Sequence, residues 1–512
     1  MTDSSKDIRV SIDGLVESEH HGEASSETDG QSNLEVVFYP DFDRRRKSSL
    51  VATNNNSRIE RSRADPYDTN TACFLHSLLN GEWITSSEAL DDIPEPSTKN
   101  EPTTPDIVVP ESSKESVVDY ASRHTEKDIP SDVQSRHLTK RQLSDMAWNV
   151  RNLSKRLGSL MLKLTVKNVL LVTKAHDESL IGLTREVTQW LLSKDRDAPL
   201  TVYVERRLQD HPDFNASRLI DEEPSANGRL KYWDSKLAPE RPHMFDFVVT
   251  LGGDGTVLYT SWLFQRTVPP VLSFALGSLG FLTKFDYNDF RSTLTNAFRD
   301  GVVISLRLRF ECTVMRSNHH EKCQEGSAAK RDLVEELIGE EIGDRLTHTP
   351  DKVFEILNDV VVERGPNPTM SSIELFGDDE HFTTVQADGI CISTPTGSTA
   401  YNLAAGGALS HPENPVILVT AICAHTLSFR PIILPDTVVL RMGVPYDART
   451  TSWASFDGRE RIELQPGDYV TVSASRYPFA YVLPTRRRGE DWVHRISKTL
   501  NWNSRQRQKA FK

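Results

Sequence analysis

FDFVVTLGGDGT, residues 245–256, is the stretch that decides the fold class. Its first seven residues are almost wholly apolar, which is typical of a central parallel strand covered on both faces. The strand runs directly into GGDGT, and a helical apolar pattern follows at TVLYTSWLFQ. A glycine-rich turn between a buried strand and a helix is where open α/β sheets bind ligands. We therefore predict an α/β nucleotide-binding domain with its site at this turn.

The sequence around this turn alternates between strands and helices. Helical spacing over 138–164 precedes the apolar run VKNVLLVTK, and a helical pattern over 177–194 precedes the strand LTVYVE. After the turn, PPVLSFAL predicts another strand and NDFRSTLTNAF an amphipathic helix. This rhythm is typical of parallel βαβ units, so we place the α/β domain at 136–302.

Beyond Ile304 the pattern changes to short β-branched runs such as ISLRLRFECTVM, VFEILNDVVVE and DYVTVSAS. Short alternating strands predict a mostly-β C-terminal domain, which we place at 303–485. A charged stretch at 317–350 interrupts it and is expected to be a surface insertion with one short helix.

Charge is distributed unevenly along the 512 residues, whose formal net charge is -13. Residues 1–135 hold 13 basic and 27 acidic side chains, a net charge of -14, so the remainder carries +1. This N-terminal region is rich in polar residues and lacks sustained periodicity, so we expect it to be disordered. Residues 486–512 form a basic tail, which predicts a solvated segment or a contact with the chain itself rather than a nucleic-acid partner.

Several classes of protein are excluded by composition. No stretch approaches the roughly 20 apolar residues of a spanning helix, and the N-terminus MTDSSKDIRV lacks the pattern of a signal or transit peptide. The five scattered cysteines indicate reduced thiols. The sequence SNHHEKC at 317–323 lacks the regular spacing and fourth ligand of a metal site. We therefore expect a cytoplasmic protein without a membrane partner and without a metal site of its own.

The GGDGT turn offers a carboxylate, Asp254, among three glycines. Gly252, Gly253 and Gly255 would let the backbone approach a phosphate, and the following helix N-terminus favours negative charge. Asp254 could accept a proton from an attacking hydroxyl or help hold a phosphate-bound metal. It could equally cap the helix, with the glycines merely making the turn.

A second glycine-rich turn, TPTGSTAY at 394–401, also follows a predicted strand. Its hydroxyls could cover phosphates or ribose oxygens, although a capped turn alone would explain them. Asp388 at the other end of the same strand, and Asn358 with Asp359 in an otherwise apolar strand, favour a ligand. Such groups are costly to bury without partners, and a carboxylate can accept hydrogen bonds from a ribose diol. A P-loop and a GxGxxG fingerprint are both absent from the sequence.

Five sequence blocks together resemble NAD kinase, in its fungal cytosolic form. They are GGDGT (252–256), GSLGFLT (277–283), LND (357–359), ADGICISTPTGSTAYN (387–402) and HTLSFRPIILP (425–435). The resemblance covers roughly Leu138 to Leu483. GGDG alone is shared with diacylglycerol, sphingosine and phosphofructo-kinases, whereas STPTGSTAY is far more specific. The resemblance implies the two-domain architecture common to NAD kinases and diacylglycerol kinases.

The same resemblance implies a reaction and a set of site residues. The γ-phosphoryl group of ATP, with Mg²⁺ or another divalent cation, would pass to the 2′-hydroxyl of the adenosine ribose of NAD, and NADH could also be accepted. Asp254 would be the proton acceptor, and Asp388 would reach the site of a neighbouring subunit in a homo-oligomer. The implied NAD-binding residues are Gly255, Phe281, Asn358, Asp359, Gln386, Asp388, Thr396, Thr399, Ala400, Tyr401, Asn402 and Arg459. The implied ATP and phosphate-binding residues are Gly252, Gly253, Gly255 and Thr256.

One position departs from the family pattern, because Ala404 stands where many relatives carry a serine that contacts the dinucleotide. Two alternatives also remain at this point. A lipid kinase of the diacylglycerol or sphingosine type would use the same GGDGT turn but has no use for two ribose-binding acids. A non-catalytic NADP sensor would keep the pocket and lose the reaction, which the intact Asp254 argues against.

Overall fold

The computed structural model describes residues 134–175, 177–194, 199–276, 280–318, 332–338, 347–484 and 490–502. Residues 1–133 of the acidic region predicted to be disordered, 1–135, therefore lie outside the described residues. Parts of the 317–350 insertion and about half of the basic tail also lie outside them. Among the described helices, not one is both long and apolar enough to cross a membrane.

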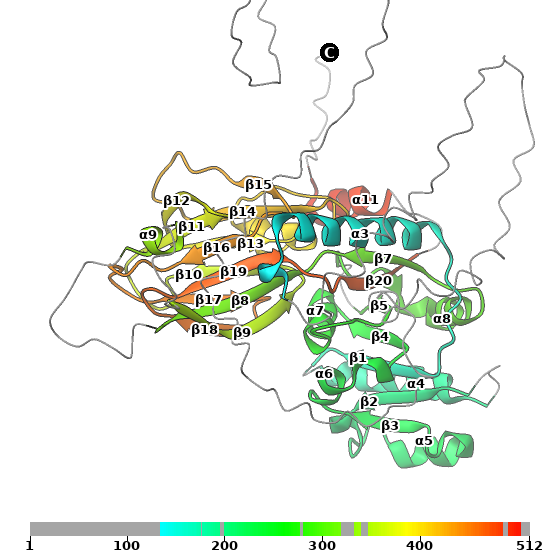
Figure 1. Cartoon of the computed structure of the whole chain (residues 1–512). Helices are drawn as coiled ribbons and strands as arrows, with labels where there is room; N and C mark the ends of the chain where they lie inside the picture. The colour runs from blue at the N-terminus through cyan, green and yellow to red at the C-terminus, as the bar shows by residue number, and fades with distance from the viewer. Residues whose placement is uncertain are drawn as a thin grey trace, which may run out of the picture. The chain divides into compact units, whose positions relative to one another are not determined.

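The strands of the described residues form three sheets, and the first is the α/β sheet. In Figure 1 its strands stack from β3 at the bottom to β7 at the top. Pairing is parallel from β3 through β5 and on to β20, and antiparallel between β20 and β7. In spatial order the strands are β3 (Leu230–Trp233), β2 (Thr201–Glu205), β1 (Asn168–Thr173), β4 (Phe247–Gly252), β5 (Val271–Ala275), β20 (Phe479–Leu483) and β7 (Val303–Arg307), with β6 (Phe285–Asp286) paired to β5.

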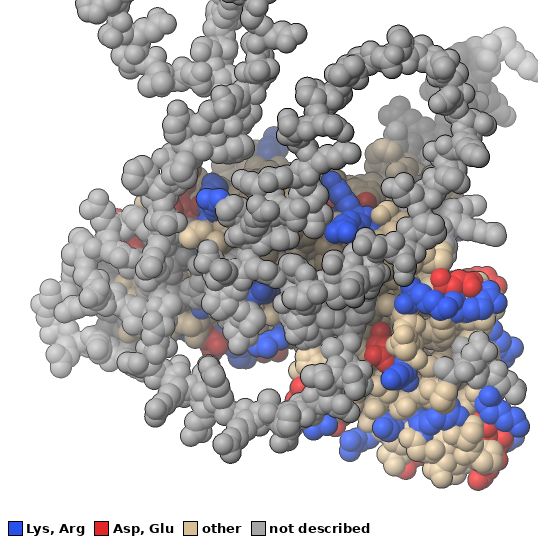
Figure 2. Space-filling view, turned by 45° about the vertical axis from the view of Figure 1, so that its right-hand side comes forward, with Lys and Arg blue, Asp and Glu red and all other residues tan. Residues whose placement is uncertain are grey.

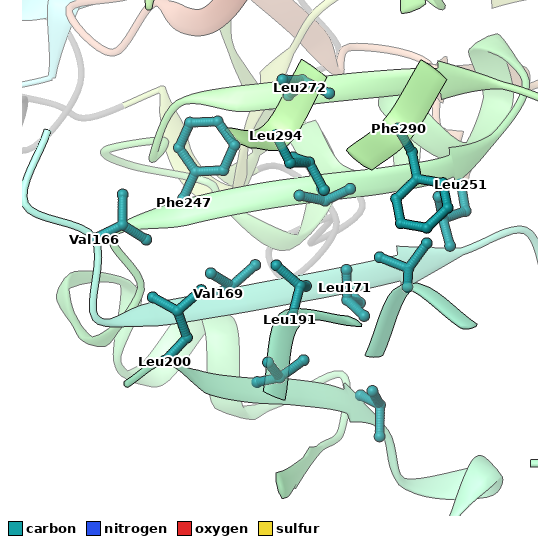
Figure 3. Close-up of a cluster of buried hydrophobic side chains, with 14 of the residues drawn as sticks. Val166, Val169, Leu171, Leu191, Leu200, Phe247, Leu251, Leu272, Phe290 and Leu294 are labelled. Atoms are coloured by element: carbon teal, nitrogen blue, oxygen red, sulfur yellow. The ribbon is translucent and has the colours of Figure 1, made fainter. Parts of the chain in front are cut away.

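Helices cover both faces of this sheet, which explains why β4 is apolar and buried along its whole length. Phe247 and Leu251 of β4 point to the face packed by α4 and α8, where Leu191 and Leu294 meet them (Figure 3). Val248 points to the opposite face. The helices of the described residues are α3 (Lys140–Ser159), α4 (Ile181–Leu192), α5 (Ala216–Glu222), α6 (Leu237–Glu240), α7 (Asp254–Leu263), α8 (Phe290–Arg299), α9 (Leu333–Ile338), α10 (Tyr401–Ala404) and α11 (Glu490–Leu500).

Single-turn 3₁₀ helices connect several of these elements. They are η5 (Ser135–His137), η6 (Glu178–Leu180), η7 (Arg206–Leu208), η8 (Pro224–Ala226), η9 (Pro242–Met244), η10 (Tyr287–Asp289) and η12 (Thr396–Thr399).

Two antiparallel sheets make up the β-rich part of the chain. One has the spatial order β15 (Ile432–Pro435), β14 (Val416–Ile422), β13 (Gly389–Ser393), β10 (Asp359–Glu363), β17 (Ser452–Phe456), β18 (Glu460–Leu464). The other has the order β12 (Glu380–Ala387), β11 (Ser371–Gly377), β16 (Leu440–Gly443), β19 (Tyr469–Ala474), β8 (Phe310–Ser317), β9 (His348–Ile356). Their inner faces share one apolar cluster, so the two sheets pack face to face as a sandwich. The predicted combination of an α/β domain and a mostly-β domain is confirmed.

The two domains interlock at their boundary in a way that the sequence ranges 136–302 and 303–485 do not describe. Strands β7 and β20, which lie at the two ends of the range 303–485, pair with each other inside the α/β sheet. The chain therefore leaves the α/β sheet through β7, builds the sandwich, and returns through β20. Pairing between strands some 170 residues apart has no local signal, so hydrophobic periodicity could not reveal it.

Helix α3 joins the two domains on the outside (Figure 1). A capping box with Gln142 starts it, because Thr139 and Gln142 each accept the other's backbone N–H, at 3.2 and 3.0 Å. Near its start, Leu143 packs with Val439 of the β-rich part, whereas near its end Ser154 donates to the carbonyl of Leu306 in β7. One rigid helix thus bridges both parts of the fold.

Two further expectations concern charged segments. The 317–350 insertion contains the expected short helix, α9, whose Leu333 and Leu337 are buried against the outer face of a sandwich sheet. Over the surface left uncovered at the lower right of Figure 2, cationic and acidic side chains are interspersed.

Candidate active site

The GGDGT turn lies at the carboxyl end of β4, and Asp254 is the first residue of α7. Gly253 and Gly255 have open space where a side chain would be, so a ligand can approach their backbone. Thr256 is buried one residue further along the helix. A strand end and a helix N-terminus therefore meet as the sequence predicts, with backbone N–H groups at the positive end of the helix.

The Asp254 carboxylate faces the loop that follows β5. Its Oδ2 accepts the backbone N–H of Phe281 at 2.8 Å, and its Oδ1 accepts that of Leu282 at 2.9 Å. Gly280 makes this approach possible, because a Cβ there would lie 2.0 Å from Asp254 Oδ1. Each carboxylate oxygen keeps a further lone pair, so Asp254 can still accept a hydrogen bond from a substrate hydroxyl.

The Asn358–Asp359 turn is organised by an acid that sequence analysis missed. Asp457 accepts three backbone N–H groups, from Leu357 at 2.8 Å, Asn358 at 2.7 Å and Asp359 at 3.2 Å. It lies in the turn between β17 and β18 with a φ of 49°, a left-handed conformation that Asp tolerates better than most residues. The Asp-Gly pair at 457–458, which is typical of a tight turn, was the signal that could have identified it.

Asp359 is an acid in an unusual environment. Its side chain is buried, and the carboxylate of Asp457 lies nearby. Burial, followed by repulsion from Asp457, raises the pKa of Asp359 to about 7 from an ordinary value of 3.8. A perturbed acid next to a ligand-facing turn is typical of a functional site.

The TPTGSTAY turn packs directly on the Asn358–Asp359 turn. Thr394 donates its backbone N–H to the carbonyl of Asn358 at 2.8 Å. Gly397 is required there, because a Cβ would lie 2.3 Å from the same carbonyl oxygen. The hydroxyl of Thr396 is buried and has no hydrogen-bond partner among the described residues, which suits it to receive a ligand.

Arg459 connects the sandwich to the GGDGT turn. Its guanidinium donates to the carbonyl of Gly255 at 3.1 Å and lies over the Tyr259 ring at 4.7 Å. Asp457, two residues earlier, holds the Asn358–Asp359 turn, so one loop contacts both predicted halves of the site.

One cavity contains residues from two of the predicted blocks, GSLGFLT and ADGICISTPTGSTAYN. Phe281, Thr396 and Thr399 line it together, and the Asp254-bound residue Leu282 lines it as well. The GGDGT and TPTGSTAY turns therefore meet on the same side of the molecule. Trp492 and Arg495 of α11 also line this cavity.

Three of the predicted NAD-binding residues, Gln386, Asp388 and Asn402, do not line this cavity within one subunit. Asp388 precedes β13 at the end opposite Thr394, roughly 20 Å away at about 3.3 Å per residue, and Gln386 lies just before it in β12. Asp388 pairs with Arg364 at 2.9 Å. Asn402 is fully buried, with its amide donating to the carbonyl of Ala408 at 3.0 Å, so it supports the turn from inside.

Two of the remaining predicted residues lie at the end of the turn at 394–401. Tyr401 is 40% exposed at the start of α10, and partial desolvation of its phenol, followed by the charge of Glu363, raises its pKa. Ala400 precedes it with its backbone turned out of the helical region. Gly277 to Leu279 of the GSLGF block lie outside the described residues.

Within the described segments, no group of three His, Cys, Asp or Glu side chains lies close enough to hold a metal ion. Histidines 319 and 320 and Cys323 are outside the described residues.

Two family models match the chain. Residues 169–302 match the ATP-NAD kinase N-terminal domain, and residues 357–483 match the ATP-NAD kinase C-terminal domain. The first match ends just before β7, and the second ends with β20, so the second includes the strand that returns to the α/β sheet.

Similar proteins agree with these matches. NAD(+) kinase of Saccharomyces cerevisiae is 44% identical over 370 residues, which are 72% of this chain and 66% of the yeast protein. ATP-NADH kinase of the same yeast is 41% identical over 72% of this chain and 70% of its own length. The crystal structure of yeast NADH kinase complexed with NADH has a TM-score of 0.51 and 28% identity, and covers 67% of this chain and 90% of that one. The chain therefore belongs to the ATP-NAD kinase family.

Proposed function

We propose that this protein transfers the γ-phosphoryl group of ATP to the 2′-hydroxyl of the adenosine ribose of NAD or NADH, forming NADP or NADPH. Membership of the ATP-NAD kinase family supports this reaction, as do relatives named for NAD(+) and NADH phosphorylation. The alternatives of a lipid kinase and of a non-catalytic sensor find no support in these similarities.

The observation that carries the proposal is the convergence of two glycine-rich turns. Asp254 accepts the backbone N–H groups of Phe281 and Leu282, and both of these residues line one cavity with Thr396 and Thr399. A loop bound by an acid of the α/β domain thus lies beside hydroxyl groups from the sandwich. Phosphoryl transfer needs positioning and neutralisation of charge more than covalent chemistry, and such an arrangement supplies positioning.

Asp254 would orient the attacking 2′-hydroxyl and accept its proton. Its two backbone hydrogen bonds fix the carboxylate in place while leaving lone pairs free for the substrate. Removal of a well-placed base costs about 10²- to 10⁴-fold in rate. The open backbone at Gly253 and Gly255, with Gly252 and Thr256 beside them, would face the phosphates.

The sandwich would recognise the dinucleotide. Asp359 would accept hydrogen bonds from the diol of the nicotinamide-side ribose, with Asn358 beside it. The Thr396 hydroxyl, Thr399, Ala400, Tyr401 and Phe281 would line the remainder of the pocket. Arg459 would act mainly by tying Gly255 to this domain, since its guanidinium already donates to that carbonyl.

A divalent cation such as Mg²⁺ would enter with ATP, held chiefly by the phosphate oxygens. When bound, it would neutralise charge on the transferred phosphoryl group. Asp254 is the carboxylate of the GGDGT turn that could assist it.

A homo-oligomer would explain the position of two predicted residues. Gln386 and Asp388 lie at the end of β13 remote from Thr394, so within one subunit they do not join the cavity. Serving the site of a second copy would give them a role, and light scattering on the purified protein tests this. The cytoplasm stays the predicted place of action, without a nucleic-acid partner.

The decisive assay uses the purified full-length protein with ATP, Mg²⁺ and either NAD or NADH. The product is read with an NADP-specific dehydrogenase, directly for NADP and after oxidation for NADPH, and diacylglycerol is offered in a parallel reaction. We expect product from the dinucleotides and none from the lipid. Phosphorylation of diacylglycerol but not of NAD would overturn the proposal.

Asp254→Asn tests the assigned base. We expect turnover to fall by about 10²- to 10⁴-fold while NAD still binds, as measured by calorimetry. Asp210→Asn, at an exposed position of the same domain, serves as the matched control and should keep wild-type turnover. A near-normal kcat in Asp254→Asn would mean that the carboxylate is a structural group only.

A further inference from the structure

Helix α11 belongs to the basic C-terminal tail and lies beyond the last residue, 483, of the family match. It is amphipathic, with Arg495 and Ile496 buried, although Arg495 carries a charge and is only 5% exposed. A charged side chain is rarely buried without partners, because losing its hydration is costly. The partners of Arg495 therefore indicate what this helix does.

Arg495 donates to the backbone of the loop that Asp254 also holds. Its Nη1 lies 2.6 Å from the carbonyl oxygen of Gly280 and 3.0 Å from that of Thr283. Between these two carbonyls, Phe281 and Leu282 donate their N–H groups to Asp254. The loop is thus bound through its carbonyls by a cation and through its N–H groups by an anion.

The 280–283 loop has little room to move relative to the Asp254 carboxylate. A single added Cβ at Gly280 would lie 2.0 Å from Asp254 Oδ1, so the loop and the carboxylate are already in close contact. A shift of the loop by an ångström would move the donors that orient the carboxylate. Misplacement of about 1 Å can cost roughly 100-fold in rate.

A second contact fixes α11 over the cavity. The Trp492 ring meets the His411 ring edge to face, with 5.3 Å between centroids. Both rings line the cavity that also contains Phe281 and Thr396. Helix α11 therefore forms part of the wall of the candidate active site, and Arg495 points from that wall to the loop.

We propose that Arg495 is a positioning residue for phosphoryl transfer, which holds the 280–283 loop so that Asp254 is oriented toward the substrate hydroxyl. This inference rests on the proposed function, and it assigns a role to a helix outside both matched family domains. Arg495 would act through the loop backbone, because its guanidinium donates to the carbonyls of Gly280 and Thr283.

The test compares Arg495→Ala and Arg495→Lys with Lys498→Ala, an exposed cation on the same helix that serves as a matched control. We expect Arg495→Ala to lower kcat by about 10- to 100-fold, with little change in the KM for ATP. A lysine can reach only part of the two-carbonyl site, so Arg495→Lys should recover part of the loss. Lys498→Ala should match the wild type.

Hydrogen–deuterium exchange separates this proposal from the proposed function. In Arg495→Ala the peptide containing Phe281 and Leu282 should exchange faster than in the control, whether or not the wild type phosphorylates NAD. A lower melting temperature with unchanged kcat and unchanged exchange at 281–282 would show that Arg495 only stabilises the fold, and would overturn the inference. If Arg495→Ala does not fold, Arg495→Lys decides by the same two measurements.

Discussion

Asp359→Asn tests the electrostatics of the sandwich side of the site. Burial and the neighbouring Asp457 raise the pKa of Asp359 to about 7 from 3.8, so the folded protein keeps a proton that the unfolded chain releases between about pH 4 and pH 7. In that window the free energy of unfolding falls by roughly 1.4 kcal/mol per pH unit, and above pH 7 this contribution stays constant. The loss over the whole window is on the order of 4 kcal/mol.

Asparagine imitates the protonated acid and does not titrate. Urea unfolding of both proteins at pH 5 and pH 8 should show the wild type losing about 2 to 3 kcal/mol more than Asp359→Asn as the pH rises. Other titrating groups, such as Glu355 with a pKa raised to about 8, are common to both proteins and cancel in the comparison. Equal losses in the two proteins would refute the assigned environment of Asp359.

Binding of NAD should show the opposite dependence on pH. A ribose diol donates hydrogen bonds, so it favours the ionised carboxylate. The affinity of the wild type for NAD should therefore fall by up to about tenfold per pH unit below pH 7, since only the ionised fraction binds well. Asp359→Asn should bind weakly and without this slope, and calorimetry at pH 6, 7 and 8 measures both. A wild-type affinity that is flat across this range would remove Asp359 from the ribose site.

Two further substitutions test which contacts keep the site in its geometry. Gly280→Ala should lower kcat by about 100-fold while the fold persists, because its Cβ would lie 2.0 Å from Asp254 Oδ1 and must displace the loop or the carboxylate. An unchanged kcat would contradict the close contact between this loop and Asp254. Arg309→Met should lower the free energy of unfolding by about 3 to 5 kcal/mol in urea, because the fully buried guanidinium donates to backbone carbonyls that include that of Phe264, just beyond α7, at 2.7 Å; a loss below 1 kcal/mol would contradict this role.

Much of the fold could be predicted from local pattern. The apolar run at 245–251 indicated a strand buried on both faces, and β4 is buried along its whole length. The two strands that interlock the domains could not be assigned in the same way. β20 has the composition of any short buried strand, and only its distant partners β5 and β7 place it in the α/β sheet.

The residues of the candidate site also differ in whether local sequence could identify them. Residues with a chemical signature, such as Asp254 and Asp359, could be predicted because glycines or apolar neighbours make an acid conspicuous. Arg495 could not, because its partners are backbone groups of a distant loop, and Asp457 left only the turn signal of an Asp-Gly pair. Asn402 shows the converse, since a motif position that suggested ligand contact serves the interior of the turn.

The contacts that shape this site join charged side chains to backbone rather than to other side chains. Asp254 and Asp457 accept N–H groups from two loops, whereas Arg495 donates to carbonyls of one of them. Backbone groups are present whatever the side chain, so such contacts fix the path of a loop and leave its side chains free to meet a ligand. Catalysis of phosphoryl transfer depends on dipoles and donors that are already in place before the transition state forms. The rate of this enzyme should therefore depend strongly on residues that bind the loops of the site without touching a substrate, as we propose for Arg495.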